Sequence, residues 1–224
     1  MKILALETTE RTASVAAIID DNLLLEKALE PGRQSARCLA PAIKQLLADA
    51  DWQSHEVELV AVAVGPGSFT GLRLGMATAK TFAYCTGARL LGVGTFETIA
   101  AAAPEFVSDL SLAVDAQRGQ VVVAELHRGE DGWFVPSAPS KLLDADVWLT
   151  DLPPFMWVGG PALRRYSDRV PASVGMLPQT LWAPSAAQVG RVAYHDWGVG
   201  RRDDLWTLSP IYSRRSAAEE KLER

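Results

Sequence analysis

Cysteine is scarce in this sequence, and long apolar runs are missing. Cys38 and Cys85 are far apart and form no Cys-x-x-Cys motif, so we expect two reduced, buried thiols and no disulfide framework. No run of about 18 apolar residues is present that could cross a membrane. The residues that follow Met1 lack the apolar core of a secretory signal. These absences predict a cytoplasmic protein.

Histidine and positive charge are also limited. His55, His127 and His195 are dispersed without metal-ligand spacing, so we predict no metal site. The sequence has no Gly-x-Ser-x-Gly elbow and no glycine loop ending in Gly-Lys-Ser/Thr, which argues against a serine hydrolase and a P-loop nucleotidase. A net charge of −5 with a pI near 5.3 disfavours a dedicated nucleic-acid binder.

The most informative segment that is present spans 62–76. An apolar run over 59–64 predicts a buried strand. It ends at Gly65-Pro-Gly67, where glycine tolerates the backbone angles of a sharp turn. Ser68 can then cap a helix that we expect over 69–85. A strand, a glycine turn and a helix N-terminus can form an anion cradle, although such a unit is more often only a turn.

Two stripes of small or apolar residues run along this predicted helix. Leu72, Met76, Ala79 and Ala83 form one stripe, and Gly71, Gly75, Thr78 and Phe82 form the other. One apolar stripe is enough for the chain's own core. Glycine inside a helix costs roughly 1 kcal/mol relative to alanine, so we interpret the glycine stripe as a surface that a second helix approaches closely.

The order of predicted elements repeats in the two halves of the chain. In the first half we expect strands at 2–6, 13–19 and 23–29, a helix over 34–50 that bends at Pro41, and then the strand and helix described above. Leu112–Leu126 repeats the strand, acidic residue, hairpin and strand of Leu4–Ile18. A strand, Gly-Pro turn and helix over 155–170 repeat the corresponding unit at 60–82.

This repetition predicts an α/β protein with two similar domains, each a mixed sheet flanked by helices. We place the first domain at 1–105, with the partner-binding helices, and the second at 106–212. The second would contain a last helix over 185–197 and an edge strand over 205–212. A charged tail, 213–224, would follow.

Two strand–hairpin–strand units with an acidic residue at the end of the first strand resemble the actin/hexokinase/Hsp70 (ASKHA) fold. Within that fold, four motifs are similar to the TsaB family, which is also called YeaZ. They are Ile3-Leu-Ala-Leu-Glu-Thr-Thr9, Gly65-Pro-Gly-Ser-Phe-Thr-Gly-Leu-Arg-Leu-Gly75, Val114-Asp-Ala-Gln-Arg-Gly119 and Pro210-Ile-Tyr-Ser-Arg214. The resemblance runs nearly end to end, although 145–200 matches only in outline.

The resemblance implies a non-catalytic partner in the synthesis of N6-threonylcarbamoyladenosine (t6A) at position 37 of tRNAs that read ANN codons. A related subunit, TsaD, transfers the threonylcarbamoyl group, and the P-loop ATPase TsaE completes the complex. The chain would contact TsaD helix on helix, or form a homodimer, and would reach tRNA through the complex. The expected interface residues are Arg37, Pro41, Lys44, Ala48, Gly71, Gly75, Thr78 and Phe82.

Two departures from catalytic relatives bear on chemistry. TsaD carries a His-x-x-x-His motif after its third strand, whereas Arg33-Gln-Ser-Ala-Arg-Cys-Leu-Ala-Pro41 contains no histidine. Glu7 stands where the fold commonly has a shorter aspartate. We therefore expect no catalytic residue and no cofactor of the chain's own, with ATP and Mg²⁺ entering only within the complex.

Some polar residues have two open interpretations. Glu7, Thr8, Thr9 and Ser68 are candidate phosphate or nucleotide contacts, and the alternative is a hydrogen-bonded turn. For Asp115 we favour a structural turn. The alternative function for the whole chain is a stand-alone ASKHA-type ATPase or kinase, and the least favoured is a peptidase.

Overall fold

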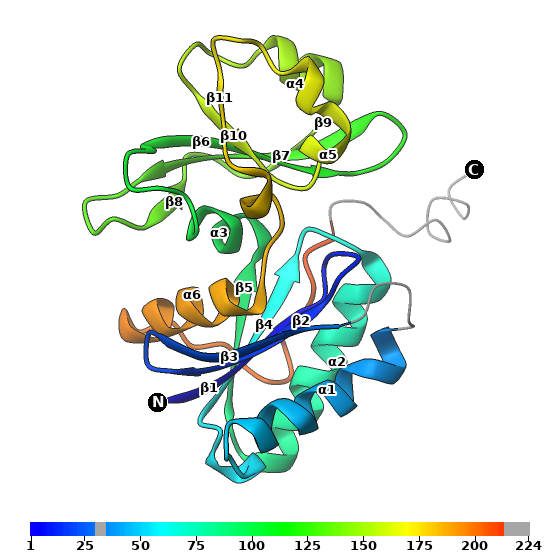
Figure 1. The fold of residues 1–224 in the computed structure, drawn as a ribbon, viewed down its shortest axis with the longest axis vertical. Coiled ribbons are helices and arrows are strands. Elements are labelled where there is room, and N and C mark those ends of the chain that lie inside the picture. Colours follow the sequence, from blue (N-terminus) through cyan, green and yellow to red (C-terminus); the bar gives the residue numbers. More distant parts are fainter. Residues whose placement is uncertain (30–34, 213–224) are drawn as a thin grey trace. The chain divides into compact units, whose positions relative to one another are not determined.

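The computed structural model describes residues 1–29 and 35–212, which form two compact units (Figure 1). Unit 1 combines Met1–Thr98 with Pro184–Ile211, and the intervening Ile99–Ala183 belongs to unit 2. The structure thus divides the chain differently from the predicted domains 1–105 and 106–212. The reason is helix α6 (Ala186–Gly198), which packs on the sheet of unit 1.

Unit 1 contains a five-stranded mixed sheet in the order β3-β2-β1-β4-β5. The central strand β1 pairs antiparallel with β2 and parallel with β4. Both β1 and β4 are buried along almost their whole length, as their continuous apolar runs predicted. The strands are β1 (Lys2–Glu7), β2 (Ser14–Ile19), β3 (Asn22–Ala28), β4 (Leu59–Gly65) and β5 (Arg89–Gly94).

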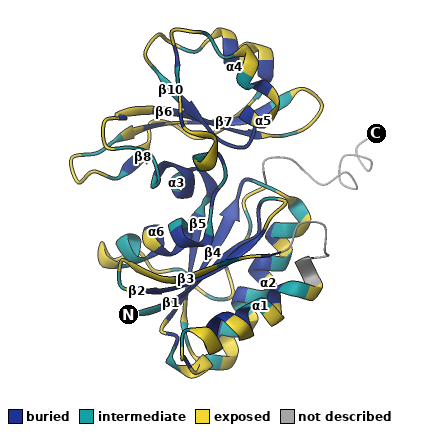
Figure 2. Cartoon of the chain, in the orientation of Figure 1, coloured by how far each residue is buried: buried dark blue, intermediate teal, exposed yellow. Residues whose placement is uncertain are grey.

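Helices cover both faces of this sheet. Helices α1 (Ser35–Asp49) and α2 (Phe69–Thr86) share one hydrophobic core with alternate residues of β1, β2 and β4. On the opposite face, a side chain added to Gly190 of α6 would touch Ile18 and Ala5. Figure 2 shows the resulting pattern, with buried residues in the strands and on the inner sides of the helices. The predicted start of α1 at residue 34 lies outside the described residues.

Unit 2 repeats this topology. Its sheet has the order β11-β10-β6-β7-β8, and β9 also pairs with β7. The predicted duplication of two mixed, helix-flanked sheets is therefore confirmed. The elements are β6 (Asp109–Asp115), β7 (Gln120–Arg128), β8 (Phe134–Pro136), β9 (Lys141–Asp144), β10 (Trp157–Gly159), β11 (Gly175–Met176), α4 (Ala145–Thr150) and α5 (Leu163–Tyr166). The short helix α3 (Thr95–Ala100) contains the boundary between the units.

The segment after α6, which we call the strap (residues 201–211), is not the predicted edge strand. It covers the outer edge of β5 with side chains. Asp203 accepts a hydrogen bond from the Gly92 N–H at 2.8 Å, and Arg201 donates to the Gly92 carbonyl at 2.7 Å. These bonds satisfy edge groups of β5 that could otherwise pair with another chain. The charged tail predicted over 213–224 lies outside the described residues.

Two further observations concern the first expectations from composition. Cys85 is exposed and Cys38 is half-buried, so the prediction of two buried thiols is wrong. The helices described in 1–29 and 35–212 include none with the length and apolar character that a membrane span requires.

Candidate functional site

Two turns meet where β1 and β4 end in unit 1. One is the β1–β2 turn (residues 8–13), and the other is the β4–α2 turn (residues 66–68). The Ser68 N–H donates to the Thr9 carbonyl at 2.8 Å. A side chain on Gly67 would meet the Thr9 Cβ at 2.5 Å, so the close contact requires glycine. We call residues 7–9 and 66–68 the two-turn site.

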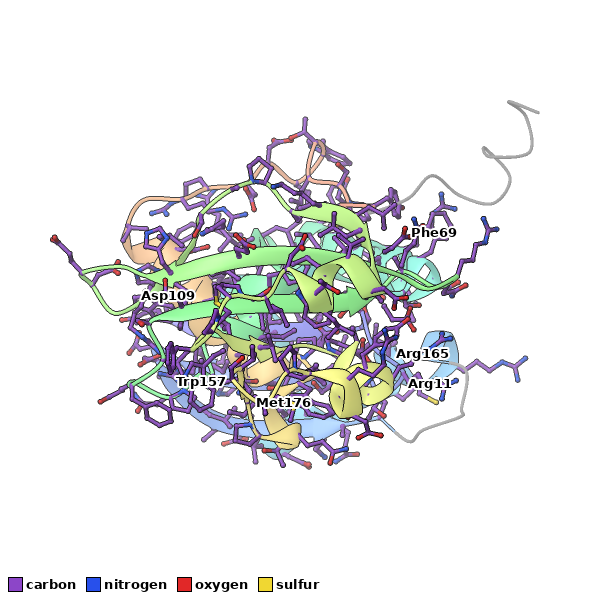
Figure 3. All side chains as sticks on the ribbon, turned by 90° about the horizontal axis from the view of Figure 1, so that it is seen from above. Arg11, Phe69, Asp109, Trp157, Arg165 and Met176 are labelled. Carbon is purple, nitrogen blue, oxygen red and sulfur yellow. The ribbon has the colours of Figure 1, made fainter. Side chains whose placement is uncertain are left out.

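The view in Figure 3 labels two residues beside this site. Arg11 is exposed in the β1–β2 turn, and Phe69 is the first residue of α2. The Arg73 guanidinium lies over the Phe69 ring, 4.0 Å from its centroid. Arg73 thus covers the apolar ring at the start of α2.

Glu7 ends β1 and has no exposed surface. Its Oε1 accepts hydrogen bonds from the Thr9 N–H at 2.5 Å and from the Thr9 hydroxyl at 2.6 Å. Its Oε2 has no partner within the described part of the chain. Burial raises the pKa of Glu7 from 4.5 to about 7, and the two Thr9 donors oppose this rise while the Glu10 carboxylate adds to it. The carboxyl group therefore titrates near neutral pH and retains one free acceptor.

Thr8 contacts the backbone of α2 directly. Its hydroxyl donates to the Gly71 carbonyl at 2.8 Å. A Cβ on Gly71 would lie 1.9 Å from the Thr8 carbonyl oxygen, and one on Gly75 would lie 2.2 Å from the Thr8 hydroxyl oxygen. The glycine stripe of α2 therefore accommodates the chain's own β1–β2 turn. This corrects our expectation that Gly71 and Gly75 face a partner.

The other predicted interface residues have two kinds of environment. On α2, Phe82 packs against the core shared with α1, and Thr78 is half-buried. On α1, Arg37, Pro41, Lys44 and Ala48 are all exposed. These four residues follow helical spacing along one line. A partner contact along the α1 line stays a prediction.

The predicted capping role of Ser68 is confirmed, because its Oγ accepts a hydrogen bond from the Gly71 N–H at 3.3 Å. The hydroxyls of Thr8, Thr9 and Ser68 thus all take part in hydrogen bonds inside unit 1. These bonds favour the structural interpretation of the site. A phosphate or nucleotide contact there stays a prediction.

Asp115 of unit 2 occupies the position that Glu7 occupies in unit 1, at the end of the first strand. Its exposed carboxylate accepts a hydrogen bond from the Gln117 N–H at 2.7 Å. Gln117 and Arg118 both have left-handed backbone angles, with φ of 63° and 54°. Asp115 therefore shapes a tight turn, as we expected.

Sequence reasoning missed one polar network at the edge of β5. Arg201 bridges the Asp196 carboxylate at 2.7 Å and the Gly92 carbonyl at 2.7 Å. Glu97 lies nearby, and burial raises its pKa while Arg201 opposes the rise. The two arginines and two aspartates over 201–204 could have indicated this network, but such a charged run is equally typical of a solvent-exposed surface.

The three histidines do not form a site together. His127 lies 3.2 Å from the Ser137 hydroxyl in unit 2, whereas His195 lies 3.3 Å from Asp196 in unit 1. Across the two described ranges, no cluster of three or more His, Cys, Asp or Glu side chains has the arrangement of a metal site.

Comparisons with known proteins agree with this fold. The family model of TsaD, described as tRNA N6-adenosine threonylcarbamoyltransferase, matches residues 30–132. The chain is 32% identical to the tRNA threonylcarbamoyladenosine biosynthesis protein TsaB of Bacillus subtilis over 149 residues, which are 66% of this chain and 65% of that protein. It is 26% identical to the protein of the same name from Escherichia coli over 235 residues, covering 99% of this chain and 98% of that protein.

A solved structure, YeaZ from Pseudomonas aeruginosa, matches the chain with a TM-score of 0.80 at 22% sequence identity. The match covers 94% of this chain and 99% of that one. This likeness shows the fold. The similarity in sequence to the Escherichia coli protein also covers nearly the whole chain. The four motifs, the duplicated sheets and these relatives together show that the chain belongs to the TsaB (YeaZ) family of the ASKHA fold.

Proposed function

We propose that this chain is a non-catalytic scaffold or activator subunit for t6A synthesis at position 37 of tRNAs that read ANN codons. It binds a TsaD-like catalytic subunit, and a TsaE-like ATPase completes the complex. Membership of the TsaB family carries the proposal, because the Escherichia coli relative named for tRNA threonylcarbamoyladenosine biosynthesis matches along almost the entire chain.

The proposed partner surface is the exposed line Arg37, Pro41, Lys44 and Ala48 on α1. Pro41 and Ala48 are compact and let a partner helix approach closely. Arg37 and Lys44 carry positive charge suited to carboxylates on the partner. The glycines of α2 are not part of this surface, because they face the chain's own β1–β2 turn. The same surface is the proposed contact of a homodimer.

The two-turn site supports a role without chemistry of the chain's own. The Glu7 carboxyl is buried, and the neighbouring hydroxyls already form internal hydrogen bonds. ATP and Mg²⁺ then act within the assembled complex. A stand-alone ATPase or kinase is the second candidate, because the buried Glu7 Oε2 has no hydrogen-bond partner within the described residues. Steady-state ATP turnover by the pure chain that disappears in Glu7→Ala would support this second candidate.

Reconstitution tests the main proposal. The chain and the TsaD-like subunit of the same organism are mixed, assembly is measured by gel filtration, and t6A is measured after addition of the TsaE-like ATPase, ATP, threonine, bicarbonate, the enzyme that makes threonylcarbamoyl-adenylate, and tRNA. Ala48→Glu places a charged side chain in the proposed surface and should weaken assembly. Ala138→Glu, at an exposed position of unit 2, is the matched control and should assemble normally. A wild-type chain that neither binds nor stimulates t6A formation would contradict the proposal.

A further inference from the structure

The β1–β2 turn and the first two turns of α2 are joined without intervening side chains. The Thr8 hydroxyl binds the Gly71 carbonyl, and the Thr9 carbonyl binds the Ser68 N–H. The turn packs directly on the backbone at Gly71 and Gly75, so a side chain at either position would clash with Thr8. Such a contact has little freedom to absorb a displacement, so a movement of residues 8 and 9 must move the start of α2 or break these bonds.

Glu7 is hydrogen-bonded to this turn through Thr9. Both hydrogen bonds to its Oε1 come from Thr9, which also holds Ser68. Its Oε2 is buried without a partner in the described chain. A negative charge on a buried carboxyl is costly unless donors or water reach both oxygens. Opening the turn would admit water to Oε2, but it would also pull Thr9 away from the α2 N-terminus.

The surroundings of Glu7 offer little compensation for that charge. Within the turn, the Glu10 carboxylate disfavours ionisation, and the Glu10 backbone N–H favours it to a smaller extent. Across β2, the paired residue is Ser14, whose hydroxyl donates to Glu26 of β3 at 3.2 Å. The Ala186 N–H of α6 donates to that same Ser14 hydroxyl, and the Ala187 N–H donates to Glu26. The neighbouring strand β4 and the first turn of α6 contain no charged residue.

We propose that the protonation state of Glu7 regulates partner binding. The neutral form holds the β1–β2 turn against α2 and so favours partner binding by the α1–α2 layer. This inference rests on the proposed function, because it assigns regulation to the same partner surface. Burial brings the pKa of Glu7 to about 7, which places the transition within the physiological range. Loss of the proton favours the open turn and weakens binding. Reciprocally, binding of the partner favours uptake of a proton by Glu7.

The test is the affinity of the wild-type chain and of Glu7→Gln for the TsaD-like subunit of the same organism, measured from pH 6 to pH 8.5. Wild-type affinity should fall by about threefold or more across this range, a modest coupling by the standard of linked sites. Glu7→Gln stays neutral, so its affinity should lack this fall. Asp115→Asn removes the exposed carboxylate of the corresponding turn and should keep the wild-type profile. Titratable groups of the partner affect the pH dependence of all three proteins equally, so the difference between wild type and each variant reports on this chain alone.

A second measurement detects the proton directly. Calorimetry near pH 7, in two buffers of different ionisation enthalpy, should show net proton uptake when the wild-type chain binds, and Glu7→Gln should show less. Binding without proton uptake, or a Glu7→Gln profile as steep as wild type, would overturn the inference and leave the proposed function intact. Failure to bind at any pH would defeat the proposed function and the inference together.

Discussion

Gly71→Ala tests whether the glycine stripe of α2 contacts the chain's own β1–β2 turn or a partner protein. The new Cβ would lie 1.9 Å from the Thr8 carbonyl oxygen, far inside the ordinary contact range of 3.4–4 Å. That oxygen belongs to the backbone, and the adjoining Thr9 carbonyl is fixed to Ser68. The turn must therefore shift away from α2 as a unit. The expected result is a loss of stability in unit 1, even though alanine is the better helix former.

The magnitude follows from three opposing contributions. Overpacking of a close contact costs about 1–3 kcal/mol. Losing the bond from the Thr8 hydroxyl to the Gly71 carbonyl costs about 1 kcal/mol, and the higher helix propensity of alanine returns about 1 kcal/mol. Because the clashing atom is a backbone oxygen, we expect a net loss near the upper end, about 2–3 kcal/mol. The melting temperature of unit 1 should fall by roughly 4–12 °C for a chain of this size.

Chemical denaturation followed by tryptophan fluorescence, together with thermal melting, measures this effect. Gly75→Ala should cost less, because its Cβ would meet the Thr8 hydroxyl, a side-chain group that can rotate away. Gly198→Ala is the matched control, since nothing lies within 4 Å of a Cβ at this position in α6. A Gly71→Ala protein as stable as wild type but unable to bind its partner would refute this reasoning and restore the partner interpretation of the glycine stripe.

Three further predictions concern single polar side chains. Burial raises the pKa of Glu7 from 4.5 to about 7 in the folded chain. The contribution of Glu7 to the free energy of unfolding is therefore complete below pH 4.5 and is lost as the pH rises to about 7, a change of about 3 kcal/mol. Urea unfolding should show this loss of stability in wild type relative to Glu7→Gln. Thr9→Ala removes one hydrogen-bond donor to Glu7 and should lower the free energy of unfolding by about 1 kcal/mol. The Mg-ATP concentration required for t6A formation should stay unchanged. A large rise in that concentration at equal stability would contradict the structural role. Arg201→Ala should speed hydrogen exchange in β5, measured by mass spectrometry, because the strap loses its bond to Gly92; unchanged exchange would show that Arg201 does not fasten the strap.

Local patterns in the sequence predicted most elements of unit 1. The apolar run before Gly65 marked β4, and Ser68 marked the start of α2, because strand burial and helix capping depend on neighbouring residues. The repeated strand–hairpin–strand unit predicted two halves with similar topology, and the two sheets do have corresponding strand orders. These features are encoded locally, so one sequence was sufficient to find them.

The errors concern contacts between distant residues. Helical spacing showed that one side of α2 is small, but it could not show whether Thr8 or another protein occupies that side. The last helix follows unit 2 in sequence, yet its Gly190 packs on β1 and β2 of unit 1. Residues 205–212 were predicted as an edge strand, whereas the side chains of Arg201 and Asp203 bind the edge of β5 instead.

The two acidic residues that end the first strands have different environments, and the neighbouring Gly-Pro turns bind different residues. In unit 1, the Ser68 N–H after Gly65-Pro66 binds the carbonyl of Thr9, two residues beyond Glu7, and the Glu7 carboxyl group is buried. In unit 2, the Ala162 N–H after Gly160-Pro161 binds the Ala113 carbonyl at 3.1 Å, two residues before Asp115. Asp115 is exposed and accepts a hydrogen bond from the Gln117 N–H of its own turn. The same topology thus contains one buried carboxyl group, whose pKa burial raises to about 7, and one exposed carboxylate, and the buried group makes unit 1 the place to look for proton-linked behaviour.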